Sequence, residues 1–327
     1  MTLAELARLA GVSRTTASYV LNGRAAANRI KPETVERVTA LAREHGFRID
    51  AQAAALRGGQ SRTLGFILPD LENASYARLA KLMEIGSREA GYQLLIAGSD
   101  DDATTEMALA ESFRARRCDA LIVASCLPPD STFYKDMQAE GLPVIAVDRA
   151  QNPDHLTCIV SDNQEGAAAL TQSLLVPGVV SIAWLDALPE SAMTQQRRTG
   201  FQNTVNDWPG EAKVYSGERY DRATGAALMR HILQENGLPD ALVTASYSLL
   251  QGVLDVLLEL PDGLPKTLRL ATFGDDRLLD FLPIAVNSLP QQHEAIARAT
   301  LEAGFAAIRG EAAPGCQVIE RRLCRRL

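Results

Sequence analysis

The chain has 327 residues, of which 46% are hydrophobic and 22% are charged, a composition typical of a folded globular protein rather than a disordered one. Its length exceeds what one hydrophobic core usually spans, so we expect two or three compact units. Glu5 and Arg8 interrupt the first turns and no apolar run is long enough to span a membrane. The sequence therefore predicts neither a secretory signal nor a membrane partner.

The cysteines and histidines argue against a metal or redox centre. The five cysteines are odd in number and lack C-x-x-C spacing, and the four histidines lie far apart. This pattern indicates reduced thiols in a cytoplasm. G-x-G-x-x-G, Walker A and G-x-S-x-G sequences are absent, and nothing nucleophilic accompanies the acidic pairs. We therefore expect no catalytic residue, no metal and no cofactor, and hence no enzyme.

Charge is distributed unevenly along the chain. Residues 1–62 contain ten Lys and Arg side chains against five acidic ones, a net charge of +5, although the whole chain carries −7. The remaining residues therefore carry −12. A basic head on an acidic body is expected when only the head meets the phosphates of double-stranded DNA.

The amino-terminal residues predict a helix-turn-helix. Helices are expected at Leu3–Ala10, at Arg14–Leu21 after the N-cap Ser13, and from Pro32 to Gly46. The spacing of Ala7, Gly11 and Ala17 suits two helices that approach closely across a tight turn. The alternative is a small helical bundle whose surface is merely basic.

The second helix of this motif is expected to enter the major groove. Arg14 can donate two hydrogen bonds to guanine, Thr15 can contact a base or a thymine methyl, and Tyr19 can reach a base or a phosphate. The DNA-binding residues predicted in this domain are Ser13, Arg14, Thr15, Thr16, Ser18, Tyr19, Asn22 and Arg29.

From Leu64 onward, strand-like and helical segments alternate, which predicts parallel sheets covered on both faces. Two Rossmann-like lobes with a cleft between them fit this length. The expected strands are Leu64–Leu68, Gln93–Ala97, Ala120–Ala124, Val144–Val147, Thr157–Val160, Val180–Leu185, Ala241–Thr244, Leu268–Phe273 and Ala285–Leu289. The expected helices include Tyr76–Ala90, Thr104–Arg116, Glu165–Leu175, Gln195–Val205, Arg222–Gln234 and Leu249–Leu260.

Ligands of such folds bind at the carboxyl ends of the strands, so polar residues just after strands are the candidates. Aspartates can accept hydrogen bonds from sugar hydroxyls, and arginine suits a phosphate. Ser75 precedes a helix expected at Tyr76, whose N–H groups could hold an anion. The candidates are Asp70, Asn73, Ser75, Tyr76, Asp148, Arg149, Ser246, Tyr247, Asp275 and Asp276.

The order of these parts resembles the lactose/galactose repressor family over the whole chain. The segments LARLAGVSRTTASYV, LGFILPDLENASYARLAK, GYQLLIAGSDD, TASYSLLQGVLDV and ATFGDDRLLDFLP are most similar to its members that respond to fructose phosphates. The resemblance implies a small all-α helix-turn-helix domain and a periplasmic-binding-protein-like effector domain. It also implies a nucleoid-associated cytoplasmic regulator of carbon and fructose metabolism, a homodimer or a tetramer, released from its operator by fructose 1-phosphate or fructose 1,6-bisphosphate.

The resemblance also divides the chain. It implies a DNA-binding domain at residues 1–47, a hinge at 48–62 and an effector domain at 63–327. The amino-terminal lobe would comprise about 63–161 and 290–320, and the carboxyl-terminal lobe about 162–289 and 321–327. In the hinge, Ala53, Leu56 and Arg57 match residues that bind the minor groove, where the leucine kinks the duplex; alternatively, Leu56 packs within a linker.

The chain departs from the family at Ile49-Asp50, where the acid weakens one expected phosphate contact, and at Lys31, where a capping serine is common. The resemblance also assigns roles in the cleft. Arg197 matches the arginine that holds the effector, Asp148 and Asp275 match sugar-binding acids, and Tyr220 and Gln291 match an aromatic and a cleft-edge residue. The predicted effector residues are Ser75, Tyr76, Asp148, Arg149, Arg197, Tyr220, Ser246, Tyr247, Asp275 and Gln291.

Other interpretations stay open at this point. Asp275 and Asp276 could cap a helix, Arg197 and Arg198 could form a solvated helix face, and Tyr220 could be a packing residue. The regulator could respond to another sugar or to a nucleobase. A sugar-binding protein or a sugar enzyme could share the body fold.

Overall fold

The computed structural model describes residues 1–21, 23, 25–47 and 60–326, and the chain divides into two compact units, Met1–Ser61 and Arg62–Leu327. The first unit contains α1 (Leu3–Leu9), α2 (Arg14–Leu21) and α3 (Pro32–Glu44). Their apolar faces pack into a small core. Its buried members are Ala7, Ala10, Ala17, Val20 and Val38.

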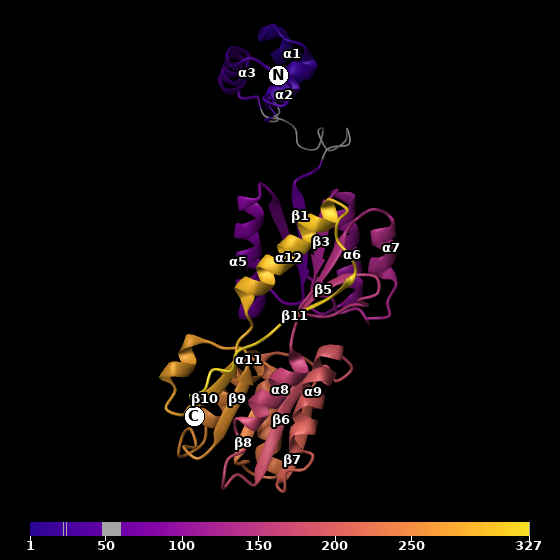
Figure 1. Cartoon of the computed structure of the whole chain (residues 1–327). Helices are drawn as coiled ribbons and strands as arrows, with labels where there is room; N and C mark the ends of the chain where they lie inside the picture. Colours follow the sequence, from indigo (N-terminus) through magenta and orange to yellow (C-terminus); the bar gives the residue numbers. More distant parts are fainter. Residues whose placement is uncertain (22, 24, 48–59, 327) are drawn as a thin grey trace. The chain divides into compact units, whose positions relative to one another are not determined.

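The second unit begins with a six-stranded parallel sheet in the order β11-β5-β4-β3-β1-β2, which we call the N-lobe sheet. Helices α5 and α12 cover one face of this sheet, and α6 and α7 cover the other (Figure 1). The bounds of these elements are β1 Thr63–Leu68, α5 Ala74–Glu89, β2 Gln93–Gly98, α6 Ala103–Ala115, β3 Ala120–Val123, α7 Phe133–Ala139, β4 Val144–Val147, β5 Thr157–Ser161, α12 His293–Ile308 and β11 Gly315–Ile319.

A five-stranded parallel sheet in the order β10-β9-β8-β6-β7 forms the C-lobe. Helices α8 and α9 cover one face of this sheet, and α10 and α11 cover the other. The bounds are α8 Asn163–Gln172, β6 Ser181–Ala187, α9 Ala192–Val205, β7 Glu211–Gly217, α10 Arg222–Glu235, β8 Ala241–Thr244, α11 Tyr247–Leu258, β9 Arg269–Phe273, the 3-10 helix η1 Arg277–Phe281 and β10 Val286–Leu289.

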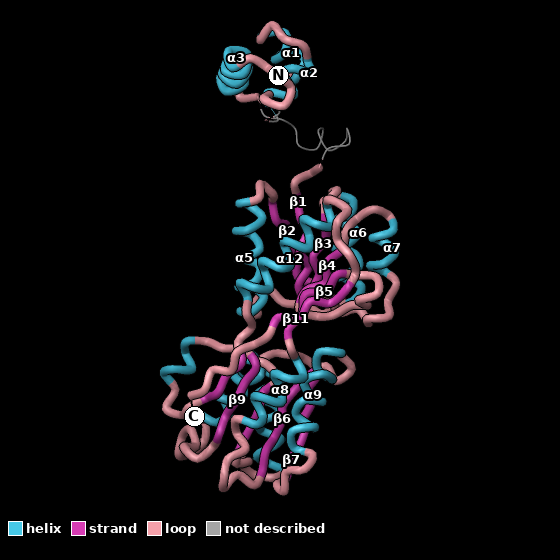
Figure 2. Tube along the Cα trace, viewed as in Figure 1, coloured by secondary structure: helices cyan, strands magenta, loops and turns pink. Residues whose placement is uncertain are grey.

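The chain passes between the lobes after β5, after β10 and after β11. After β11 it reaches the C-lobe, where Cys324 pairs with Ser288 of β10. Strands alternate with flanking helices in both lobes (Figure 2). The fold class predicted from the sequence is confirmed, whereas the edge strands β7 and β11 and the helices α7 and α12 were not among the expected elements.

Candidate functional site

Local hydrogen bonds cap the helices α1 and α2 of the amino-terminal unit, and a glycine forms the turn between them. Thr2 and Glu5 form a reciprocal capping box at the start of α1, with N···O distances of 2.7 and 3.2 Å. Gly11 has φ +64°, a left-handed conformation that costs glycine little. The Ser13 hydroxyl then accepts from the Thr16 amide at 3.0 Å, which caps α2.

The predicted DNA-binding residues of this unit lie on its surface to different degrees. Ser13, Arg14, Thr15 and Arg29 are exposed, whereas Thr16, Ser18 and Tyr19 are half-buried. The Ser13 oxygen is occupied by the cap, so its expected role becomes the placement of α2. Asn22 of this unit, and Ala53, Leu56 and Arg57 of the hinge, lie outside the described residues.

A cavity of about 400 Å³ lies between the lobes, at the carboxyl ends of strands from both sheets. We call it the effector cavity. All ten effector residues predicted from the sequence line it: Ser75, Tyr76, Asp148, Arg149, Arg197, Tyr220, Ser246, Tyr247, Asp275 and Gln291. The structure therefore brings together residues that are up to 216 positions apart in the chain.

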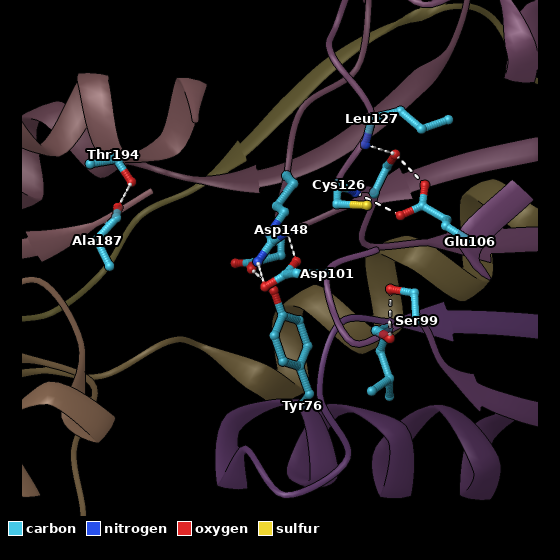
Figure 3. A network of polar contacts seen from close by, with 12 residues as sticks. Tyr76, Ser99, Asp101, Glu106, Cys126, Leu127, Asp148, Ala187 and Thr194 are labelled. Atoms are coloured by element: carbon cyan, nitrogen blue, oxygen red, sulfur yellow. Dashed lines mark hydrogen bonds and ion pairs between the residues drawn. The ribbon is translucent and has the colours of Figure 1, made fainter. Parts of the chain in front are cut away.

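Asp148 follows β4 and is only 8% exposed. It accepts a hydrogen bond from the Tyr76 hydroxyl at 2.7 Å (Figure 3) and another from the Gln291 amide. Burial by itself would raise the pKa of Asp148. The bond from Tyr76 and the positive charges of nearby arginines outweigh burial, so the pKa is lower than usual. Asp148 is therefore an ionised acceptor at neutral pH.

Arg197 is buried in the wall of the effector cavity. Gly200 allows α9 to lie against α8, because a Cβ there would stand 2.1 Å from the Gln164 carbonyl oxygen. This approach lets Arg197 Nε donate to Asn163 Oδ1 at 2.9 Å, while Nη1 donates to the Ala245 carbonyl at 2.7 Å. The side chain does not lie on a solvated helix face. Burial lowers the pKa of Arg197.

The neighbouring arginines have other partners. Arg198 forms a bidentate pair with the buried Asp186, with N···O distances of 3.0 and 2.8 Å, and supports the fold. Arg149 pairs with both carboxylate oxygens of Asp101. Arg149 also lines the effector cavity. Its side chain therefore connects the cavity to the loop after β2, which carries Asp101.

Several of the predicted polar residues also form hydrogen bonds within the fold. Asp276 caps η1 through the Leu278 amide at 2.8 Å, whereas Asp275 accepts from Ser288 Oγ at 2.6 Å and from Arg326 Nη2 at 3.0 Å. The capping interpretation therefore applies to Asp276 and not to Asp275. In addition, Ser246 caps α11, and the Tyr220 hydroxyl bonds Thr194 at 2.8 Å.

The expected start of the helix at Tyr76 was wrong. The helix α5 begins at Ala74, because Asn73 caps it by accepting from the Ser75 amide at 3.0 Å. That amide therefore has a partner already and is not an open anion site. The Ser75 hydroxyl instead donates to Gln291 Oε1 at 2.7 Å.

Sequence analysis missed Arg321, which lines the effector cavity and is 8% exposed. Among the described residues its Nε and Nη2 atoms have no hydrogen-bond partner. Burial and the nearby charge of Arg197 lower the pKa of Arg321 to about 9. Arg321 comes two residues after β11, so the rule of polar residues after strands would have found it if that strand had been predicted.

A second polar cluster fixes the loop after β3, close to the cavity. Glu106 of α6 is fully buried and accepts from the Ser125 hydroxyl and from the Cys126 amide at 2.7 Å (Figure 3). It also accepts from the Tyr134 hydroxyl at 2.6 Å. Burial and the nearby Glu106 raise the pKa of Cys126 to about 12, so this thiol stays protonated. The cluster is a rigid support and not a nucleophilic site.

Among the described helices, none combines the length and apolar character needed to cross a bilayer. The same residues contain no group of three or more His, Cys, Asp and Glu side chains that could hold a metal ion.

Comparison with known proteins agrees with this architecture. Residues 2–50 match the family described as bacterial regulatory proteins, lacI family, and residues 61–259 match the periplasmic binding proteins and sugar binding domain of the LacI family. The fructose operon regulatory protein of Vibrio cholerae is 49% identical over 323 residues, which cover 99% of each chain.

Two solved structures are similar in fold. The Cra transcriptional dual regulator of Pseudomonas putida, crystallised with fructose 1-phosphate, has a TM-score of 0.79 and 49% identity and covers 81% of this chain and 99% of its own. The lac repressor dimer bound to operator and the anti-inducer ONPF has a TM-score of 0.86 at 18% identity, with 99% and 98% covered.

The resemblance predicted from the sequence is confirmed by both family models and by the full-length relative. Membership excludes the alternative of a sugar-processing enzyme, because the family consists of regulators. The chain therefore belongs to the lacI family of bacterial regulatory proteins.

Proposed function

We propose that this protein represses or activates genes of fructose metabolism from a two-fold operator and leaves the operator when fructose 1-phosphate fills the effector cavity. The observation that carries the proposal is the incomplete hydrogen bonding of the buried Arg321 guanidinium. This guanidinium is buried with two N–H-bearing nitrogens unpartnered among the described residues. Such groups are costly to leave unsatisfied, so the cavity calls for an anion.

The remaining groups of the cavity suit the sugar. Arg197 and Arg149 line the same cavity. Asp148 and Asp275 also line it and can accept hydrogen bonds from sugar hydroxyl groups. A volume of about 400 Å³ is in the range of small-molecule sites. The fructose 1-phosphate bound to the Pseudomonas putida regulator and the name of the Vibrio cholerae relative both support this choice of effector.

The bound sugar phosphate would draw the two lobes together and alter the hinge that carries Ala53, Leu56 and Arg57. Because DNA and effector favour different states, each weakens binding of the other by the same factor. The proposed DNA contacts are Arg14, Thr15, Thr16, Ser18, Tyr19, Asn22 and Arg29, and Ser13 caps the helix α2 that presents several of them.

We infer a homodimer, located in the cytoplasm at the nucleoid. The edge strand β2 supports this inference because Leu94 and Leu95 are half-buried and Ile96 is 40% exposed in the single chain. The operator-bound lac repressor, which is a dimer, supports it as well. Light scattering of the purified protein would distinguish the dimer from a tetramer.

The test combines calorimetry with a DNA titration. Fructose 1-phosphate is expected to bind more tightly than fructose 1,6-bisphosphate and unphosphorylated sugars, and at saturation to lower the affinity for operator. A protein that begins at Arg62 should keep effector binding and lose operator binding, since the chain divides there. Unchanged operator affinity at saturating fructose 1-phosphate would reject this effector or this direction of coupling.

A further inference from the structure

His293 is the first residue of α12, at the point where the chain returns from the C-lobe to the N-lobe. It is half-buried and lines the effector cavity. Its ring Nε2 lies 2.8 Å from Ser75 Oγ, and Ser75 Oγ lies 2.7 Å from Gln291 Oε1. The Gln291 amide nitrogen in turn meets Asp148. These contacts form a continuous chain from His293 to Asp148.

The direction of every hydrogen bond in this chain follows from its last member. Asp148 is ionised and can only accept, so Gln291 presents its NH₂ group to Asp148 and its oxygen to Ser75. Ser75 has a single hydroxyl proton, which it donates to that oxygen. Ser75 must therefore accept from His293, and the ring carries its proton on Nε2.

This arrangement leaves Nδ1 as the ring atom that can gain a proton. Protonation at Nδ1 changes the charge of His293 and leaves the bond from Nε2 to Ser75 intact. The hydrogen-bond chain therefore holds in both protonation states, and only the charge beside the cavity differs.

Charged groups from four elements face this ring. Glu294 lies on its own helix, Arg78 on α5, Asp148 after β4 and Arg321 after β11. Burial lowers the pKa of His293, the two acids oppose this effect and the two arginines add to it. Arg78 is itself paired with Glu294 at 2.6 Å. The ring is thus neutral at neutral pH in the empty cavity.

We propose that His293 is a positioning residue for the effector, which orients Asp148 through Ser75 and Gln291 and takes up a proton when an anionic ligand enters the cavity. The proposal rests on the proposed function, because a phosphate supplies the anion. A dianion beside the ring favours its charged form and raises the pKa of His293 in the complex. The charge of His293 contributes to affinity below that pKa, and this contribution is lost as pH rises through it, whereas the hydrogen bond to Ser75 remains.

The experiment is calorimetry with fructose 1-phosphate from about pH 5.5 to about pH 8, across the range in which histidine titrates. Each pH is measured in two buffers of different ionisation enthalpy, which gives the protons taken up per ligand. The wild-type protein is compared with His293→Gln and His293→Ala. The free phosphate titrates in the same range and does so identically with each variant, so the comparison isolates the protons whose uptake depends on His293.

The wild-type protein is expected to take up protons on binding, and His293→Gln to take up fewer. At the upper end of the range the glutamine variant should bind within about twofold of wild type, because its amide can still donate to Ser75. At the upper end of the range His293→Ala should bind about fivefold more weakly than wild type, as expected for one lost hydrogen bond. At the lower end it should bind more weakly still, because the charge of the ring is lost as well. The control His231→Gln, on the exposed face of α10, should retain the wild-type profile.

Equal proton uptake by wild type and His293→Gln, or equal affinity of wild type and His293→Ala, would overturn the role of His293 alone. The tautomer can be read without effector from the ¹⁵N shifts of the ring, assigned by comparison with His293→Gln. A ring protonated on Nδ1 rather than Nε2 would also overturn it. Absence of fructose 1-phosphate binding by wild type at every pH would instead contradict the proposed function, and this inference with it.

Discussion

Arg197 lies over the ring of Phe273, with 4.3 Å between its guanidinium carbon and the ring centroid. Phe273 ends β9 and is almost fully buried, so one flat face of the cation is covered. The hydrogen bonds to Asn163 and Ala245 hold its edge. The orientation of Arg197 is therefore set before a ligand arrives, which reduces the entropy lost on binding.

Replacement of Arg197 with Ala should remove this preorganised cation. We expect fructose 1-phosphate to bind at least about tenfold more weakly, as for a lost charged hydrogen bond. Operator affinity without effector should stay at the wild-type value, and release by effector should be abolished. Fluorescence anisotropy of labelled operator measures both. The surface variant Arg222→Ala, whose side chain pairs with Asp255, is the control, and a normal response by Arg197→Ala would refute the assignment.

Arg321→Met should stabilise the protein and weaken effector binding together. Replacing a buried charge whose hydrogen bonds are incomplete by an apolar side chain is expected to raise the free energy of unfolding by about 1–4 kcal/mol. Urea denaturation of both proteins at pH 7 measures this change. A variant that is less stable than wild type would show that the guanidinium is well compensated without ligand.

The same arginine predicts a pH dependence. Because burial lowers the pKa of Arg321 in the fold to about 9, well below the usual value for arginine, the unfolded chain holds this proton more tightly. The cost of burying the charged guanidinium is constant at pH values below its pKa in the folded protein. Above that pKa the free energy of unfolding should rise with pH. The difference in unfolding free energy between Arg321→Met and wild type should therefore shrink above about pH 9.

Arg14→Ala should relax base preference. A lost bidentate contact to guanine costs about 1–3 kcal/mol and leaves other positions of the site unaffected. Binding to a set of operators with single base changes measures the preference, with Arg37→Ala on the exposed face of α3 as control. An equal loss on every sequence, with a reduced salt dependence, would mean that Arg14 contacts only phosphate.

Glu106→Gln should lower the free energy of unfolding of the second unit by about 1–3 kcal/mol. One carboxylate oxygen becomes an NH₂ group, which cannot accept the hydrogen bonds of the buried donors around it. The affected donors are Ser125, Tyr134 and the Cys126 amide. Urea denaturation measures the loss, and Glu111→Gln on the exposed side of α6 is the matched control. Equal stability of Glu106→Gln and wild type would mean that the cluster rearranges freely.

The comparison between expected and observed strands shows where sequence patterns fail. Central strands such as β3 and β4 are buried on both faces and read as continuous apolar runs. The edge strands β7 and β11 are half exposed and contain polar residues, so no such run marks them. The omission of β11 also removed Arg321 from the predicted site.

The sequence by itself determined the helix-turn-helix, the strand and helix alternation and the charge asymmetry, because these depend on neighbouring residues and local conformation. It also indicated which polar residues follow strands. Only the tertiary structure decided how those residues are used. Asp148 accepts from Tyr76, Asp275 accepts from Ser288 and Arg326, and two guanidinium nitrogens of Arg321 have no hydrogen-bond partner among the described residues. Such roles depend on contacts between residues far apart in the chain, which a local pattern does not encode.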